Sequence, residues 1–362
     1  MSSLARCVTV FVSGACNMNC VYCYAQQDKN NKTISITFVK TALQEFYKKG
    51  GPLGLRLFGI GEPTTAFAKM KRIVEIAKSI SSERFDIELQ SNGYFPPAVS
   101  NWVEDNVDIL WISCDGPPDI HDRYRPTRGG KPTSSVILDN IRRFSNSERC
   151  VLGVRATITS ETYPRQKEIV EFFHSLGVKH ISADPLFLPV TSYRDGLSFP
   201  RNLAVDNPEE YAEQFVLAHE RALELGIEYN SIFTVNLGTN NKFGCRGCYT
   251  NPHLTVDGVV TCCDMAFKRD TPLKEMVWGR FDGRHRRIEY IQNAKKGIFR
   301  RRAGNIPECQ GCEWEAECCG GCFGEALNET GDVCGVKKFS CRATKYILPR
   351  ISRRCIQNIG HP

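Results

Sequence analysis

The sequence predicts an α/β protein, a partial (β/α)6 TIM-like barrel followed by a small cysteine-rich domain. Short β-branched runs alternate with amphipathic stretches from residue 6 to about residue 229, a pattern typical of βα units around a parallel sheet. After residue 230 the composition changes to glycine, cysteine and charge, and twelve of the 18 cysteines lie at or beyond Cys245. We therefore predict two domains, residues 1–235 and 236–362.

Six strands are expected where β-branched and other apolar residues cluster: 7–13, 55–59, 86–91, 109–114, 151–159 and 180–186. Apolar residues recur at helical spacing before Gly50-Gly51 and before Gly177. A helix-like segment from Pro208 to Leu225 completes the barrel. In such a barrel the catalytic residues lie at the C-terminal ends of the strands.

Composition and charge limit the class of protein. The first residues show no signal-peptide pattern and no 18-residue apolar stretch occurs, so we expect a cytoplasmic metalloprotein with no membrane partner. The net charge is +7, and cations are densest over residues 280–302. Such a run can meet an acidic peptide or a nucleic acid, but it is more often a solvated face, and we expect no nucleic-acid partner.

Three cysteines directly after the first predicted strand form a C-x3-C-x2-C run: Cys16, Cys20 and Cys23. Three thiolates at this spacing can bind three irons of a [4Fe–4S] cluster and leave the fourth iron open. A structural zinc site and disulfides are the alternatives. Zinc favours four closed ligands, and disulfides need an oxidising compartment, so the spacing favours the cluster.

Unusual loops also follow the next three predicted strands. Because these loops lie at the same end of the barrel, we expect them to meet the cysteine run. They are Gly59-Ile60-Gly61-Glu62-Pro63, Gln90-Ser91-Asn92-Gly93 and Ser113-Cys114-Asp115-Gly116.

The C-terminal region holds a second set of spaced cysteines: Cys248-x9-Gly258-x4-Cys263, then Cys309-x2-Cys312-x5-Cys318-x3-Cys322, then Cys341. With Cys245 as an eighth thiol, they suffice for two [4Fe–4S] clusters. Zinc ribbons are the alternative for the C-x2-C pairs. Cys262 and Cys319 each adjoin a candidate, so the spacing leaves open which member of each pair binds. We interpret Cys7, Cys114, Cys150, Cys334 and Cys355 as packing residues.

From Cys16 to Cys341 the motifs resemble radical S-adenosylmethionine (SAM) enzymes with a C-terminal SPASM domain, a group that contains anaerobic sulfatase-maturing enzymes and ribosomal-peptide maturases. The resemblance implies that the open iron binds SAM. The family's G-G-E-P segment is G-I-G-E-P here. An ordinary ion pair is the alternative role for Asp115 and Arg155. The implied SAM contacts are Tyr22, Gly59, Gly61, Glu62, Ser91, Asn92, Ser113, Asp115 and Arg155.

The same resemblance implies two auxiliary clusters in the SPASM domain. Asp264 stands where sulfatase-maturing relatives have a proposed general base, although a loop-capping aspartate is the alternative. The implied ligands are Cys245, Cys248, Cys263 and Cys322 for auxiliary cluster I, and Cys309, Cys312, Cys318 and Cys341 for auxiliary cluster II.

We therefore expect an enzyme that uses SAM and three [4Fe–4S] clusters, with a reductant such as flavodoxin or ferredoxin as partner. The favoured substrate is a peptide or protein, in which a crosslink or an oxidised residue is formed. Formylglycine formation in sulfatases is the first alternative, and a sugar or aminocyclitol dehydrogenase or epimerase the second. A non-enzymatic iron–sulfur carrier or zinc scaffold is the alternative of another class. Because only 15 residues precede Cys16, we expect a short or internal recognition sequence, a separate recognition protein, or a substrate without a leader.

Overall fold

The computed structural model describes residues 7–26, 28–50, 54–81, 83–188, 200–238 and 242–358. Within these ranges the strands form one eleven-stranded sheet in the order β11-β10-β9-β8-β1-β2-β3-β4-β5-β6-β7. The strands from β1 to β7 pair in parallel, which confirms the predicted fold class. They are β1 (Cys7–Phe11), β2 (Gly54–Phe58), β3 (Ile87–Ser91), β4 (Ile109–Ser113), β5 (Val151–Ile158), β6 (His180–Pro185) and β7 (Glu228–Asn230).

The six predicted strands are all present, and their ends lie within two residues of the predicted positions. The structure adds β7, which the sequence analysis missed. β7 has three residues with only Tyr229 buried, so it lacks the apolar run that marks a strand.

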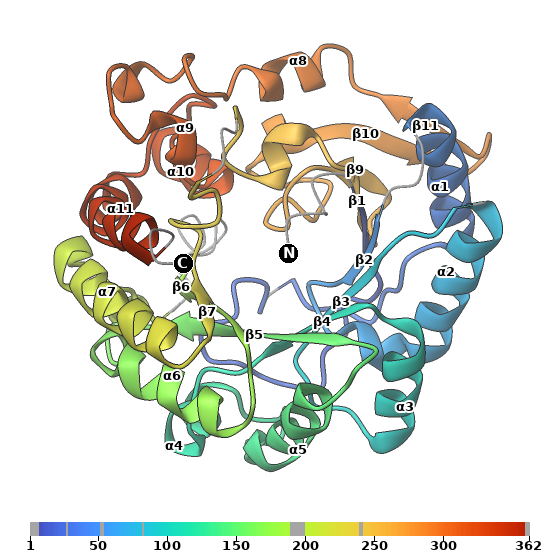
Figure 1. Ribbon diagram of the computed structural model, residues 1–362. Coiled ribbons are helices and arrows are strands. Elements are labelled where there is room, and N and C mark those ends of the chain that lie inside the picture. The colour runs from blue at the N-terminus through green and yellow to red at the C-terminus, as the bar shows by residue number, and fades with distance from the viewer. Residues whose placement is uncertain are drawn as a thin grey trace.

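Helices cover the outside of the parallel strands (Figure 1). The predicted helix after Pro208 is confirmed as α7, and it begins where the Asn207 side chain accepts hydrogen bonds from the N–H groups of Glu209 and Glu210. The helices of this part are α1 (Ile36–Gly50), α2 (Phe67–Ile80), α3 (Pro97–Asn106), α4 (Pro118–Tyr124), α5 (Ser134–Ser145), α6 (Gln166–Ser175) and α7 (Pro208–Glu224).

Along each strand, successive side chains point alternately toward the outer helices and toward the barrel interior. On β2, Leu55 and Leu57 belong to the main hydrophobic core beneath the helices. Arg56 lies between them in sequence, so its side chain faces the interior. On β2, the side chains that face the helices thus belong to the core, and a cation faces the barrel interior.

The C-terminal residues continue the same sheet. β8 pairs in parallel with β1, Thr9 opposite His253, and the following strands are antiparallel. At the other end, α11 packs beside α7, where Arg342 forms an ion pair with Glu209 at 2.7 Å (Figure 1). The predicted boundary between two domains, at residues 235/236, stays a prediction. The elements are β8 (His253–Leu254), β9 (Val259–Thr261), β10 (Val277–Asp282), β11 (Arg287–Tyr290), α8 (Ala294–Phe299), α9 (Glu315–Cys318), α10 (Phe323–Thr330) and α11 (Lys338–Asn358).

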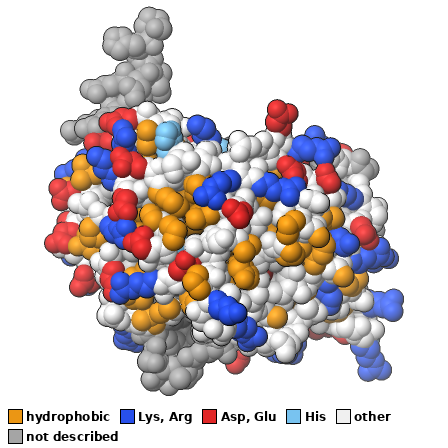
Figure 2. All heavy atoms as spheres, turned by 90° about the horizontal axis from the view of Figure 1, so that it is seen from below, with side chains coloured by type: hydrophobic (Ala, Val, Ile, Leu, Met, Phe, Trp, Pro, Cys, Tyr) orange, Lys and Arg blue, Asp and Glu red, His pale blue; other side chains and the backbone are white. Residues whose placement is uncertain are grey.

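The outer surface carries charges of both signs. On the face drawn in Figure 2, Lys and Arg side chains alternate with Asp and Glu, and hydrophobic side chains lie between them. Among the helices described, we find none with the length and apolar character needed to span a bilayer.

Candidate active site

The cysteine run lies on the loop after β1, at the C-terminal end of the parallel strands. The loop after β2 holds it in place: the N–H of Gly61 donates to Ser13 O at 3.2 Å, and the N–H of Glu62 donates to Ala15 O at 2.7 Å. The run thus sits where a barrel enzyme places its active site. Its three half-buried thiols are those of Cys16, Cys20 and Cys23.

Glycine at residue 61 is required by the close packing of these two loops. A Cβ atom there would lie 2.0 Å from the carbonyl oxygen of Ala15, and a Cβ at Gly59 would lie 2.8 Å from that of Ser13. Both contacts are with backbone, which cannot rotate away as the end of a side chain can. The two glycines predicted to contact SAM therefore also set the distance between the loops.

Replacing Gly61 with alanine is expected to push the cysteine loop away from the β2 loop. We expect a loss of about 3 kcal/mol of stability, as in an overpacked core, and reduced iron at the N-terminal site. Thermal unfolding and iron analysis measure both effects. Gly129→Ala is the matched control, because a Cβ there would meet no atom within 4 Å. Equal iron and stability in the two variants would contradict the packing argument.

Glu62 is buried beside the cysteine loop and links the ends of β2 and β3. Its carboxylate accepts hydrogen bonds from the N–H and hydroxyl of Thr64, from Ser91 Oγ at 2.8 Å, and from the N–H of Asn92 at 2.7 Å. Burial raises the pKa of Glu62, although these hydrogen bonds oppose the shift. Asn92 Nδ2 lies 3.9 Å from Cys16 Sγ. Three predicted SAM contacts thus form one hydrogen-bonded unit that reaches the cysteines.

Asp115 is fully buried, and its carboxylate is paired on both oxygens. Arg125 donates to it twice, at 2.9 and 3.0 Å, the N–H of Thr157 donates at 2.9 Å, and the Tyr22 hydroxyl also donates. Burial would raise the pKa of Asp115, but Arg125 and the hydrogen bonds hold it below its ordinary value. The geometry supports the ion-pair alternative for Asp115, and sequence reasoning missed Arg125 as the partner.

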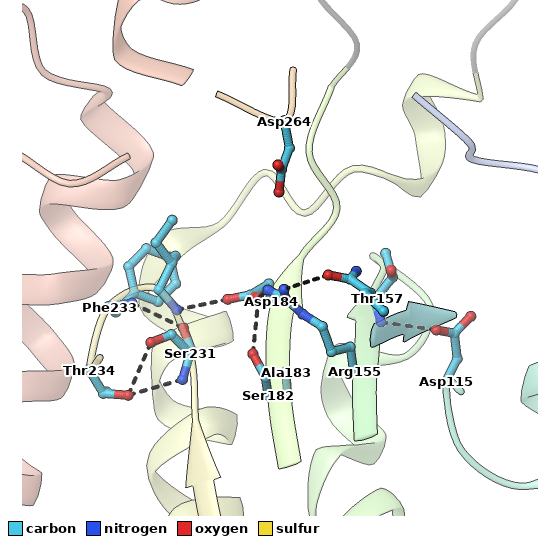
Figure 3. A network of polar contacts seen from close by, with 12 residues as sticks. Asp115, Arg155, Thr157, Ser182, Ala183, Asp184, Ser231, Phe233, Thr234 and Asp264 are labelled. Atoms are coloured by element: carbon cyan, nitrogen blue, oxygen red, sulfur yellow. Dashed lines mark hydrogen bonds and ion pairs between the residues drawn. The ribbon is translucent and has the colours of Figure 1, made fainter. Parts of the chain in front are cut away.

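Arg155 projects from β5 into the barrel interior and has weaker partners. It donates to Asp184 Oδ2 and to Gln90 Oε1, both at 3.3 Å, and 37% of its side chain stays exposed (Figure 3). The other oxygen of Asp184 accepts from the N–H of Ile232 at 2.7 Å. Ser113 stands beside Arg155 in the register of β4 and β5. Part of the Arg155 guanidinium thus remains available to a bound molecule.

Asp264 reaches into the barrel from the segment after β9 and points toward Arg155 and Asp184 (Figure 3). Arg56 Nη1 lies 2.9 Å from each oxygen of its carboxylate, and His253 Nδ1 lies 3.3 Å from one of them. Burial would raise the pKa of Asp264, but Arg56 and then His253 outweigh it, so the net shift is downward.

Sequence reasoning also missed Arg56. Its side chain is only 4% exposed, and besides Asp264 it contacts Glu88 at 3.4 Å and Gln90 at 2.7 Å. The available signal was a cation within the otherwise apolar run of β2. Burying a cation there requires anionic partners, and the structure supplies them from β3 and from the C-terminal residues.

A small apolar cluster joins the cysteine loop to the Asp264 segment. Cys23 and Tyr24 pack against a cluster that includes Phe267, and the rings of Tyr24 and Phe267 are 6.0 Å apart. The Tyr24 hydroxyl is buried and, within the described residues, has no hydrogen-bond partner. Through this cluster Cys23 and Tyr24 lie beside the segment that carries Asp264.

The first C-terminal cysteine set comes together around the start of α10. The thiols of Cys245 and Cys248 are 3.7 Å apart. Burial and then the neighbouring Cys322 raise the pKa of Cys263, and Cys263 Sγ faces Gly324, where a Cβ would lie 3.2 Å away. Cys262 is fully buried, and its thiol lies within electrostatic range of Cys245. Both neighbours therefore lie near members of this set, and Cys263 as the ligand stays a prediction.

The second set gathers where the chain enters α11. Burial, followed by Cys318, Cys341 and Cys312, raises the pKa of Cys309 to about 12, so these thiols are neighbours. Cys319 instead donates to the carbonyl oxygen of Ala316 at 3.2 Å. The geometry favours Cys318.

The spacing of the cysteine thiols can be compared with what a single metal ion and a four-iron cluster each require. In the part of the chain that the structure describes, no three Cys, His, Asp or Glu side chains converge closely enough to hold one ion. Zinc needs all four ligands at about 2.0–2.3 Å from one point. A four-iron cube has its thiolates on separate irons and so accepts wider spacing.

Fold and site together define a barrel enzyme built around a cysteine loop. Residues 10–154 match the model of the radical SAM superfamily, so the chain contains a radical SAM domain. Enzymes of this superfamily use SAM and a [4Fe–4S] cluster.

Curated relatives include an uncharacterized protein of Methanocaldococcus jannaschii, 28% identical over 177 residues, or 48% of this chain and 60% of that protein. A cysteine-type anaerobic sulfatase-maturating enzyme of Clostridium novyi is 23% identical over 86% of this chain and 85% of its own. The radical SAM cyclopropyl synthase TigE of Paramaledivibacter caminithermalis is 22% identical over 96% of this chain and 74% of its own.

Solved structures share the fold. Native anSMEcpe with bound AdoMet and Cp18Cys peptide superposes with a TM-score of 0.74 at 19% identity, covering 97% of each chain. Streptococcus suis SuiB bound to precursor peptide SuiA superposes with a TM-score of 0.64 at 15% identity, covering 92% of this chain and 75% of SuiB.

Proposed function

We propose that this enzyme cleaves SAM reductively and removes a hydrogen atom from a peptide or protein, which then gains a crosslink or an oxidised residue. The observation that carries this proposal is the shared apolar cluster. It brings the N-terminal cysteine loop beside the segment that holds Cys263 and Asp264. The site that cleaves SAM and the residues that would act on the substrate therefore border one space.

Cys16, Cys20 and Cys23 would hold a [4Fe–4S] cluster, which would supply the electron for reductive cleavage of SAM. The protein holds the cysteine loop through Gly61 and Glu62, and it excludes water with the apolar cluster. The N–H groups of Gly61 and Glu62 are already used inside the protein. Because an amine donates hydrogen bonds, we propose that backbone carbonyl oxygens of the loop after β2 accept hydrogen bonds from the methionyl amine of SAM.

Around SAM we assign orienting roles to the remaining predicted contacts. Arg155 keeps exposed donors for a carboxylate, and Asn92 sits between the cysteine loop and β3. Asp115 orients Tyr22 through its hydroxyl. An anionic electron carrier such as flavodoxin or ferredoxin is the proposed reductant, and the two C-terminal cysteine sets would hold auxiliary clusters.

Asp264 is the proposed proton acceptor for the substrate. Its carboxylate is fixed by Arg56, yet 33% of the side chain is exposed, so one edge can meet a substrate atom. Arg56 also keeps the carboxylate oriented toward the barrel interior, where Arg155 and Asp184 lie (Figure 3).

Formylglycine formation on a sulfatase is the second candidate, favoured by the sulfatase-maturating names among the relatives. TigE and SuiB favour peptide maturation more broadly, because one is named a cyclopropyl synthase and the other was solved with a precursor peptide. Peptides containing Cys or Ser, incubated anaerobically with SAM and dithionite, separate the two by mass. An aldehyde product supports sulfatase maturation, and loss of hydrogen with a new crosslink supports the broader proposal.

Iron analysis with a SAM cleavage assay tests the proposal as a whole. We expect about twelve irons per chain and 5′-deoxyadenosine formation under dithionite. Zinc without iron, or iron without 5′-deoxyadenosine, would contradict it.

Asp264→Asn is expected to preserve 5′-deoxyadenosine formation and to lower peptide product by about 10²–10⁴-fold, the usual contribution of a positioned proton acceptor. The amide keeps the size of the side chain but cannot take the proton. Anaerobic turnover followed by mass spectrometry measures both products.

The matched control is Asp270→Asn, because Asp270 is exposed on the same segment. It should behave as the unmodified enzyme does. Unchanged peptide product in Asp264→Asn would remove Asp264 from the mechanism and leave it a structural partner of Arg56.

A further inference from the structure

Arg301 is a cation that is fully buried in the C-terminal region. Within the described residues, the hydrogen-bond acceptors of its guanidinium are backbone carbonyls. Nη1 donates to Val333 O at 3.0 Å and Gly335 O at 2.7 Å, and Nη2 donates to Gly320 O at 2.5 Å and Gly321 O at 3.3 Å. Its central carbon also lies 5.5 Å from the centre of the Phe323 ring. Among the described residues, no carboxylate forms an ion pair with it.

The two loops that Arg301 joins lie between proposed cluster ligands. Gly320 and Gly321 separate Cys318, of the second set, from Cys322, of the first. The other loop, residues 333–335, leads into α11 and Cys341. One guanidinium therefore fastens the short link between the two ligand sets to the segment that supplies the last ligand.

The backbone of the link is shaped to receive this side chain. Cys319, Gly320 and Gly321 have φ values of 47°, 75° and 71°, so three successive residues are left-handed. A Cβ at Gly320 would lie 3.0 Å from Arg301 Nη2 and 2.6 Å from Ile306 Cδ1. This conformation is costly for Cys319, which indicates that the surroundings impose it.

A buried cation needs nearby negative charge, and carbonyl dipoles alone compensate for only part of the lost hydration. The guanidinium lies within electrostatic range of Cys245, Cys248 and Cys319. Four thiolates around a [4Fe–4S] core make a net anion, and one-electron reduction adds a further negative charge. A cluster at the first set, which includes Cys245 and Cys248, would place negative charge near the guanidinium.

We propose that Arg301 is a positioning residue for the two auxiliary clusters: its guanidinium fastens the link between their ligand sets, and its charge favours the reduced state of auxiliary cluster I. This inference rests on the proposed function, since it requires the clusters to form. The two roles are separable, because lysine keeps the charge but cannot reproduce the planar donor pattern that binds four carbonyls.

The experiment uses the full chain with Cys16, Cys20 and Cys23 changed to alanine, so that only auxiliary iron is observed. Arg301→Met and Arg301→Lys are compared with Arg302→Met, which removes an exposed neighbouring cation. Iron per chain reports the fastening role. Electron paramagnetic resonance during a titration with dithionite reports the reduction potential.

We expect Arg301→Met to retain less than about half of the auxiliary iron, since groups that support cluster ligands affect metal affinity strongly. In auxiliary cluster I, the ratio of reduced to oxidised form at a fixed potential should fall at least tenfold. The reduction potential of that cluster then becomes more negative by about 59 mV for one electron. Arg301→Lys should also lose iron, yet keep the reduction potential of the parent. Arg302→Met should match the parent in both.

Iron in Arg301→Lys equal to that of the parent would overturn the fastening role. Equal reduction potentials in the methionine variant and the parent, or equal shifts in the methionine and lysine variants, would overturn the electrostatic role. If Arg301→Met does not fold, Arg301→Lys still tests the proposal. A reduction potential that differs from that of the parent, although the positive charge is retained, would contradict the electrostatic role. A parent with no iron would refute the auxiliary clusters themselves, and with them this inference.

Discussion

Changing Cys16, Cys20 and Cys23 together to alanine is expected to abolish 5′-deoxyadenosine formation and to remove about four of about twelve irons. The three thiols lie on one loop after β1, whereas the proposed auxiliary ligands come from residues 245–341. The two groups of ligands are held by different backbone segments. Losing the first should therefore leave the second loaded.

Iron analysis and a SAM cleavage assay under dithionite check this result. The matched control removes three thiols to which no cluster is assigned: Cys7→Ala, Cys114→Ala and Cys150→Ala, all buried. This control should keep SAM cleavage, although it makes small cavities. Loss of all iron in the first variant would contradict independent sites, and continued SAM cleavage would contradict the assignment of the cysteine loop.

The parallel strands β1 to β6 could be predicted from the sequence because each is a short, largely apolar run bounded by loops. Local pattern is enough for such elements, and the polar residues that end them could be assigned to one face of the barrel. β8 illustrates the opposite case. It has two residues, His253 and Leu254, and it exists because β1, more than 240 positions earlier, offers a free edge. No local pattern reports such a pairing.

The spacing of the proposed cysteine ligands could be read from the sequence, but the ion pairs of the site could not. The run of Cys16, Cys20 and Cys23 is a local pattern, whereas the division of the C-terminal cysteines into two sets came from the family resemblance and stays a prediction. Arg56 and Arg125 became visible only with the fold, because their partners come from other strands and loops. The choice between Cys262 and Cys263 likewise depends on which side of the backbone faces Cys322, and spacing alone does not determine it.

Asp115→Ala is expected to lower the free energy of unfolding by about 3–5 kcal/mol, because it leaves the Arg125 cation without its partner in the barrel interior. Arg125 is 10% exposed and Asp115 is not exposed at all, so water cannot replace the lost carboxylate. Urea denaturation under anaerobic conditions measures the change. Asp139→Ala is the matched control, since its pair with Arg142 is exposed and should contribute less than about 1 kcal/mol.

The same variant distinguishes the two roles considered for Asp115. If its carboxylate mainly orients Tyr22 and neutralises Arg125, the double variant Asp115→Leu/Arg125→Met should recover much of the lost stability, because an apolar pair can replace a buried ion pair. SAM affinity per folded molecule should then change little in the double variant, since the carboxylate is already saturated by Arg125, Thr157 and Tyr22. If the double variant instead recovers stability but no longer binds SAM, Asp115 is assigned to the cofactor site. Its ion pair with Arg125 would then serve to orient the carboxylate toward SAM.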